Sequence, residues 1–228
     1  MRQVKGRILG SLVGLMSLSL VGCSQQEMED LSRVSGYEPI LAEDGTIDPI
    51  KNTIKIAMTL PGFLDRNEAE TTPDPALEQV LIDHYQLDPQ QCKETQYYYN
   101  YLDLNDDGAM EIFVLLLGPY TTTESGSSAA LVLQGEEGYY VEKSFTNLYM
   151  PFVVSNQTNE GWHDLVLVVG EGGRMDHYVV LRYENNAYGI STHPVEQIES
   201  IDGTIYLCND LEEDQKNGNF LILGDGIK

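Results

Sequence analysis

The chain has 228 residues, of which 36 are acidic and 13 are basic, and its formal net charge at pH 7 is −23. A protein that binds nucleic acid needs a basic surface to neutralise the phosphates, so this charge excludes nucleic acid as a partner. The same charge favours solubility and attracts cations.

The first 22 residues are typical of a signal peptide. Arg2, Lys5 and Arg7 precede an apolar stretch from Ile8 to Val21, which is too short for a membrane span of about 20 apolar residues. Residues 1–22 are therefore predicted to be removed. They hold three of the 13 basic residues and none of the 36 acidic ones, so the mature chain keeps 10 basic residues and a formal charge of −26.

The apolar stretch ends in Leu20-Val21-Gly22-Cys23, which resembles the lipobox of bacterial lipoproteins. The resemblance implies that the Cys23 thiol is acylated and that the leader is cleaved just before it. The protein would then be exported and anchored in the lipid bilayer of a bacterial membrane, since each buried methylene of an acyl chain contributes about 0.8 kcal/mol of membrane affinity. The alternative is an unmodified thiol after an ordinary signal peptide.

Residues 23–46 are polar and acidic and have no sustained hydrophobic period, which predicts a flexible tether. Residues 47–95 are predicted to form a helical segment. A short helix should end before Pro61, and a second helix should begin after the N-cap Asp74 and end near Leu87. The apolar stripe of the second helix consists of Leu77, Val80, Leu81 and Tyr85.

In residues 96–228 the hydrophobic period changes to two, which is typical of β-strands. Tyr97, Tyr99 and Tyr101 alternate on one face, residues 112–117 form a continuous apolar run, and further strand-turn-strand patterns follow. No helix pattern appears after residue 95. The predicted fold is mainly β, an antiparallel meander that follows a small N-terminal helical segment.

Residues 96–228 also contain a candidate internal repeat. The stretch that begins at Asp103 aligns with the stretch that begins at Asn156, so that Gly108 falls on Gly161 and Glu111 on Asp164, and the hairpins that follow align as well. This pattern predicts two degenerate repeats that are similar to propeller blades. The alternative is that two β meanders align by chance.

The loop that opens the first copy has the spacing of a calcium-binding loop. Oxygen atoms at alternating positions of a tight turn converge on one point, and a glycine permits the bend. The candidate ligands are the side chains of Asp103, Asn105, Asp107 and Glu111 and the carbonyl of Ala109. The alternative is a plain hairpin turn, because Asp, Asn and Gly are the commonest turn residues.

This loop and the strand after it resemble the FG-GAP and VCBS-type repeats of many secreted bacterial proteins. The resemblance implies a β-repeat module with Ca²⁺ as cofactor. The Phe-Gly and Gly-Ala-Pro signatures of those repeats are absent, and the second copy has Asn156, Thr158 and Glu160 where the ligands would stand. The chain is also similar to secreted bacterial lipoproteins in which such a loop leads into a Cys-bearing glycine-rich loop, but that cysteine is missing here.

Two connecting loops that occupy the same place in the two copies form the candidate ligand-binding surface. The first contributes Tyr120, and the second contributes Glu171, Arg174 and Asp176. The alternative is that these loops are ordinary mobile connections.

Two cysteines remain after Cys23, and the sequence leaves their state open. Cys92 and Cys208 either form a disulfide in an oxidising exported compartment or remain two separate thiols.

No catalytic residue is predicted, because the sequence has no G-x-S-x-G motif and no paired constellation of catalytic carboxylates. The expected function is a non-enzymatic, lipid-anchored module that binds a protein or a glycan. The alternatives are an envelope hydrolase whose acidic residues act as general acid and base, and a purely structural envelope protein.

Overall fold

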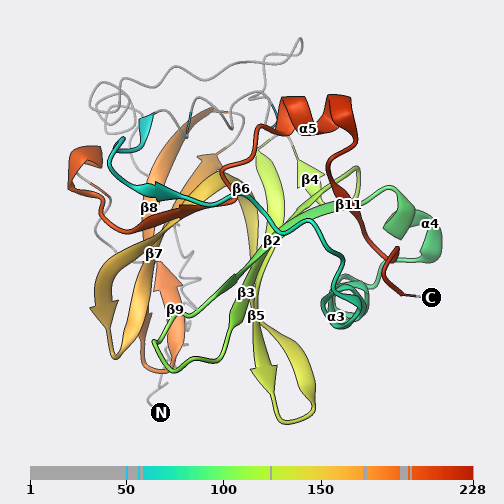
Figure 1. The fold of residues 1–228 in the computed structure, drawn as a ribbon, viewed down its shortest axis with the longest axis horizontal. Helices are drawn as coiled ribbons and strands as arrows, with labels where there is room; N and C mark the ends of the chain where they lie inside the picture. The colour runs from blue at the N-terminus through green and yellow to red at the C-terminus, as the bar shows by residue number, and fades with distance from the viewer. Residues whose placement is uncertain are drawn as a thin grey trace, which may run out of the picture.

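Figure 1 shows the computed structural model, which describes residues 50, 56, 59–123, 125–171, 174–190, 195 and 197–227. The side chains of residues 171, 174–177 and 190 are outside this description. The predicted signal peptide, Cys23 and the predicted tether also lie outside it. Of the first predicted helix, Ile50, Ile56 and Thr59 are described and are helical.

The prediction of a mainly β fold is confirmed, since strands account for 47% of the structure. One sheet of 11 strands is open at both ends, with the order β11-β2-β3-β5-β6-β7-β8-β9. The strands on this path are β2 (Gln96–Leu102), β3 (Glu111–Leu117), β5 (Gly126–Gly135), β6 (Gly138–Asn159), β7 (Trp162–Glu171), β8 (Arg174–Glu184), β9 (Ala187–Ile190) and β11 (Leu221–Ile222).

Three short strands lie off this path. They are β1 (Asp65–Arg66), β4 (Thr122–Thr123) and β10 (Thr204–Tyr206). β10 pairs antiparallel with β6, and β1 pairs with β10 in the parallel direction. Residues 65–66, which precede the first meander by about 30 residues, therefore run beside a segment near the C-terminal end of the described chain.

Strand β6 joins two successive meanders. Leu148 is the last β6 residue paired with β5 and the first paired with β7. The β2-β3-β5-β6 meander and the β6-β7-β8-β9 meander therefore share this strand. Their inner faces meet in a central core, where Phe113 of β3 packs on Phe152 of β6 with ring centroids 4.4 Å apart.

Alternation along β3 and β7 places one face of each strand in the central core. Phe113 and Leu115 belong to this core from β3, and Leu165 and Leu167 belong to it from β7. A shift of one residue moves a strand side chain to the opposite face. Consequently Glu111, which pairs with the core residue Leu102, lies on the inner face, whereas Asp164, next to Leu165, lies on the outer face.

The aligned residues Glu111 and Asp164 are thus not equivalent in the structure. Asp164 is 3% exposed and accepts hydrogen bonds from the Arg182 guanidinium at 3.0 and 3.1 Å. Gly108 and Gly161 do correspond locally, since both have φ of 83°. The internal repeat stays a prediction.

Helix α3 (Pro75–Tyr85) confirms the second predicted helix. The Asp74 side chain accepts the backbone N–H groups of Ala76 and Leu77, and Gln86 ends the helix in the left-handed region. The stripe residues Leu77 and Leu81 are fully buried against the outer faces of β2, β3 and β5. The helix therefore packs directly on the first meander, and Figure 1 shows it beside that sheet.

A buried carboxyl group on α3 holds the C-terminal segment against the sheet. Glu78 is 0% exposed, and it accepts a hydrogen bond from the Tyr97 hydroxyl at 2.8 Å and another from the Gly226 backbone N–H at 2.9 Å. Glu78 thus joins the helix, strand β2 and the residues after β11.

Two further helices were not predicted. Helix α4 (Pro89–Lys93) begins with a capping box of Asp88 and Gln91. Helix α5 (Leu211–Asn217) lies in the region where no helix was expected, so that expectation is wrong. With one buried residue, Leu211, a helix of this length shows no hydrophobic period in the sequence. Within the described part of the chain, no helix is long and apolar enough to cross a membrane.

Candidate functional site

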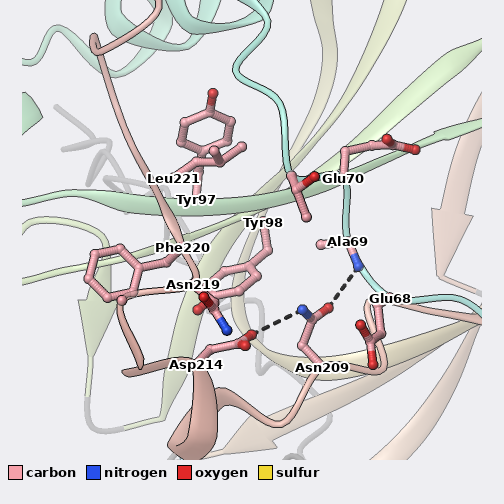
Figure 2. A pocket seen from close by; sticks show the side chains of 12 residues that line it. Glu68, Ala69, Glu70, Tyr97, Tyr98, Asn209, Asp214, Asn219, Phe220 and Leu221 are labelled. Atoms are coloured by element: carbon pink, nitrogen blue, oxygen red, sulfur yellow. Dashed lines mark hydrogen bonds between the residues drawn. The ribbon is translucent and has the colours of Figure 1, made fainter. Parts of the chain in front are cut away.

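A cavity of about 450 Å³ lies between residues 68–71 and residues 218–221. Cavities of about 300–1,000 Å³ are typical of sites for small organic ligands. Figure 2 shows the residues around it. They are Glu68, Ala69, Glu70, Thr71, Tyr97, Tyr98, Asn209, Asp214, Gly218, Asn219, Phe220 and Leu221.

Asn209 fixes one end of the cavity by joining two segments that are far apart in the sequence. Its side-chain oxygen accepts the backbone N–H of Ala69 at 2.8 Å, and its side-chain N–H donates to the Asp214 carboxylate at 3.0 Å. Figure 2 shows both bonds as dashed lines, with Asp214 and Glu68 on either side of Asn209. Asn209 is 9% exposed, so both bonds are at least partly buried.

A second buried amide holds the same segments to the sheet. The Asn100 side chain donates to the Glu68 carbonyl at 2.9 Å and accepts the Leu207 backbone N–H at 3.2 Å. The Glu70 backbone N–H donates to the Tyr99 carbonyl at 2.8 Å. Hydrogen bonds to strand β2 therefore hold the wall formed by residues 68–71 in place.

The opposite wall follows helix α5. Gly218 ends the helix with φ of 71°, a left-handed conformation that suits glycine. The chain then turns, with the Asn219 N–H donating to the Asp214 carbonyl, and Leu221 pairs with Tyr97 of β2. Hydrogen bonds to the sheet therefore fix both walls.

All charged residues that line the cavity are acidic: Glu68, Glu70 and Asp214. Burial raises the pKa of the Asp214 carboxyl, the Asn209 hydrogen bond lowers it, and the nearby Glu68 carboxylate raises it again. No Lys, Arg or His is among the lining residues, so a positively charged ligand would relieve this repulsion.

Tyr98 places a buried phenol beside the cavity. Its side chain is 2% exposed and lines the cavity, and its hydroxyl is shielded from water. Figure 2 shows its ring running toward Asn219 and Asp214. Burial and the nearby Asp214 raise the pKa of this hydroxyl, whereas a hydrogen bond with the Gln215 side chain lowers it, so it stays neutral.

The predicted calcium loop is closed by its own hydrogen bonds. The Asp103 carboxylate accepts the backbone N–H groups of Asp107 and Gly108, and the Asp107 carboxylate accepts the N–H of Ala109 at 2.7 Å and the Asn105 side-chain N–H at 2.8 Å. These bonds are typical of an Asx-rich turn.

Glu111, the last candidate ligand, is 6% exposed and accepts the Leu104 backbone N–H at 2.8 Å. Burial raises the pKa of its carboxyl, and the nearby Asp107 and Asp103 carboxylates raise it further. In the described part of the chain, no three His, Cys, Asp or Glu side chains are grouped so that they could hold a metal ion. Calcium binding by this loop stays a prediction.

Calcium titration followed by thermal melting tests that prediction. If the loop binds Ca²⁺, the ion stabilises the folded state by about 2.7 kcal/mol at a hundredfold excess over Kd, and the Tm rises. Asp107→Ala should abolish the rise because it removes a ligand oxygen, whereas Asp106→Asn should preserve it, because Asp106 is not a candidate ligand. A Tm that stays constant up to about 10 mM calcium, well above the affinity of most extracellular modules, would identify a plain turn.

The other predicted ligand residues lie in two loops that meet through the backbone. Gly170, just before Glu171, lies so close to Ser125 that a Cβ there would be 2.3 Å from the Ser125 carbonyl oxygen. Glu171 and Arg174 are paired at the β7–β8 turn, where Asp176 follows in β8. Tyr120 is 50% exposed, and the Glu94 carboxylate raises the pKa of its hydroxyl. Tyr120 does not line the cavity.

Both described cysteines are free thiols, so the structure shows the second of the two alternatives and not a Cys92–Cys208 disulfide. Cys92 packs with α3 and the first meander, whereas Cys208 packs against a different cluster that includes Ile205. Burial raises the pKa of both thiols.

Comparison of the chain with protein-family models, with curated proteins and with solved structures finds no match.

Proposed function

We propose that this chain is a lipid-anchored, exported module that binds a small ligand without catalysing a reaction, and that the cavity beside Tyr98 is its binding site. The observation that carries the proposal is a cavity of about 450 Å³ whose lining combines carboxylates and amides with the side chains of Tyr98, Phe220 and Leu221.

The walls of the cavity are already ordered by hydrogen bonds, which supports its role as a binding site. Asn100 and Asn209 hold residues 68–69 by hydrogen bonds, and Leu221 is held by its pairing with Tyr97, so a ligand would not have to order these walls when it binds. A site that is already ordered loses less entropy on binding than a flexible one.

The proposed anchor rests on the leader and on Cys23. A Cys23→Ala variant should leave the membrane fraction or retain its leader, because the acylated thiol supplies the membrane affinity. If this variant were processed and still required detergent for extraction, the lipid anchor would be wrong.

A screen of simple probes tests the cavity. We expect at least one probe among an alkyl diamine, a dicarboxylate and a neutral N-acetylated sugar to shift the ring NMR signals of Tyr98 and Phe220 in the mature protein. Thr71→Trp should weaken the shift by filling the cavity, whereas Thr72→Trp should not, since Thr72 is exposed and outside the lining. If no probe moved these signals at millimolar concentration, the cavity would not be the binding site.

A further inference from the structure

We infer that the ligand of this cavity is a neutral sugar, held by hydrogen bonds to its hydroxyl groups and by contact of one ring face with Phe220. The inference rests on the proposed function and deepens it, because it names the chemical class of the ligand. It follows from the polar surface of the cavity, from the donors and acceptors in its lining, and from the Phe220 ring.

The surface of the cavity is more polar than apolar, so it suits a ligand with many polar groups. Four exposed residues contribute polar side chains to the lining: Glu68, Glu70, Thr71 and Asn219. Because exposed polar groups are hydrated, a ligand that displaces this water has to replace its hydrogen bonds. A hydrocarbon cannot replace them, whereas a polyhydroxylated ligand can.

The lining offers hydrogen-bond donors as well as acceptors. The Asp214 carboxylate accepts the Asn209 side-chain N–H at 3.0 Å, and it also makes a hydrogen bond with the Asn219 side chain. A side-chain amide has two N–H donors and an acceptor oxygen, so the bond to Asp214 leaves Asn219 with a donor and an acceptor for a ligand. The Thr71 hydroxyl likewise donates and accepts. An ammonium group only donates and a carboxylate only accepts, but a sugar hydroxyl does both.

The carboxylates of the lining favour a ligand that carries hydroxyl groups. Glu68 and Glu70 lie in the same wall and provide exposed acceptors. A hydrogen bond from a hydroxyl group to an ionised carboxylate is roughly twice as strong as one between neutral groups. A neutral sugar provides such donors without adding a negative charge, whereas an anionic ligand would be repelled by these carboxylates.

Phe220 provides an apolar surface for one face of a sugar ring. The residue is half-buried and directly follows Asn219, and Figure 2 shows both side chains at the cavity. The C–H groups on one face of a sugar ring carry a partial positive charge, so they are attracted to the negative face of an aromatic ring. Leu221 pairs with Tyr97 of β2, so the backbone next to Phe220 is fixed to the sheet. A sugar that stacks on Phe220 would present its hydroxyl groups to the neighbouring Asn219 amide.

An NMR titration of the mature protein in detergent tests the inference, with the backbone amide signals of residues 218–221 as the readout. The neutral sugars are glucose and N-acetylglucosamine. Glucuronate adds a negative charge to the glucose ring, and 1,4-cyclohexanediol keeps a six-membered ring but has fewer hydroxyl groups. The tighter of the two neutral sugars should bind at least tenfold more tightly than glucuronate or the diol. Its affinity should not change when salt is raised to about 0.5 M, because salt screens only charged ligands.

Two variants test the contacts in the same titration. Phe220→Leu keeps an apolar side chain but removes the aromatic face, and it should weaken the sugar at least fivefold. Asn219→Ala should weaken it by a similar factor, and since Asn219 is exposed, this variant tests the site even if Phe220→Leu fails to fold. Asn217→Ala is the matched control, because Asn217 is exposed on α5 and outside the cavity lining, and it should bind the sugar as the unmodified protein does.

Disaccharides separate two sources of the sugar. If cellobiose or N,N′-diacetylchitobiose binds at least tenfold more tightly than its monosaccharide, the ligand is part of a glycan chain. If the disaccharide binds equally or more weakly, the ligand is a free monosaccharide.

The results that would overturn the inference differ from those that would overturn the proposed function. If neither neutral sugar shifts the signals but the alkyl diamine or the dicarboxylate does, the inference is wrong and the proposed function stands. If no probe shifts them at millimolar concentration, the proposed function fails as well. Equal affinity for the diol and the sugars, or equal weakening by Asn217→Ala and Asn219→Ala, would also show that the site does not recognise a sugar.

Discussion

Replacing Glu78 by Ala should lower the free energy of unfolding by about 3 to 5 kcal/mol, because the change leaves one buried and one half-buried donor unpaired and opens a void. The donors are the Tyr97 hydroxyl and the Gly226 backbone N–H. Urea denaturation of the mature protein measures the loss, and amide hydrogen exchange should show that residues 221–227 exchange fastest.

Glu78→Gln is the matched control for this prediction. Glutamine keeps the size of the side chain and one acceptor oxygen, so it should cost about 1 to 2 kcal/mol, the penalty for one lost partner. If Glu78→Ala and Glu78→Gln lost the same small amount of stability, the Glu78 carboxyl would not hold the C-terminal segment.

Gly203→Ala should destabilise the fold by a similar amount, about 3 to 5 kcal/mol, the sum of overpacking and backbone strain. Gly203 has φ of 121°, and a Cβ there would lie 2.0 Å from the Val154 carbonyl oxygen and 2.8 Å from the Ser155 Cα. Since these contacts are backbone atoms of β6, rotation of a side chain cannot relieve them. Thermal melting and urea denaturation measure the effect.

Gly161→Ala is the control that separates the loss of stability caused by steric overlap from the loss caused by positive φ. Gly161 also has positive φ, 83°, but nothing lies within 4 Å of a Cβ at this position. This variant should therefore cost only about 1 kcal/mol, the penalty of a left-handed residue with a side chain. Equal losses for Gly203→Ala and Gly161→Ala would contradict the close approach of residue 203 to β6.

The parts of the fold that the sequence predicts are those set by neighbouring residues. Asp74 and Pro75 mark the start of α3, and Leu77 and Leu81 mark its buried face. The apolar run of β3 and the two-residue turn between β8 and β9 are local signals of the same kind. A cap, a turn or a periodic face depends on a few adjacent positions, so the sequence alone contains the information.

The candidate site could not be predicted in this way. Tyr98 stands between two of the alternating tyrosines, and its place in the wall of a cavity becomes visible only in the packed structure. The hydrogen bond between Asn209 and Ala69 joins residues that are 140 positions apart, and no local sequence pattern predicts it. The sequence also does not show that Glu111 and Asp164 lie on different faces, since one residue of slack in the alignment reverses which face a side chain occupies.

The two walls of the cavity come from residues 68–71 and 218–221, and the whole meander lies between them. Contacts over such a separation require a large loop to close, which makes them late and slow to form. During synthesis the first meander can assemble while residue 209 is still absent, but the cavity cannot. Ligand binding would therefore begin only after the C-terminal segment has been synthesised and has packed. Binding of the ligand would then indicate that the entire domain has folded.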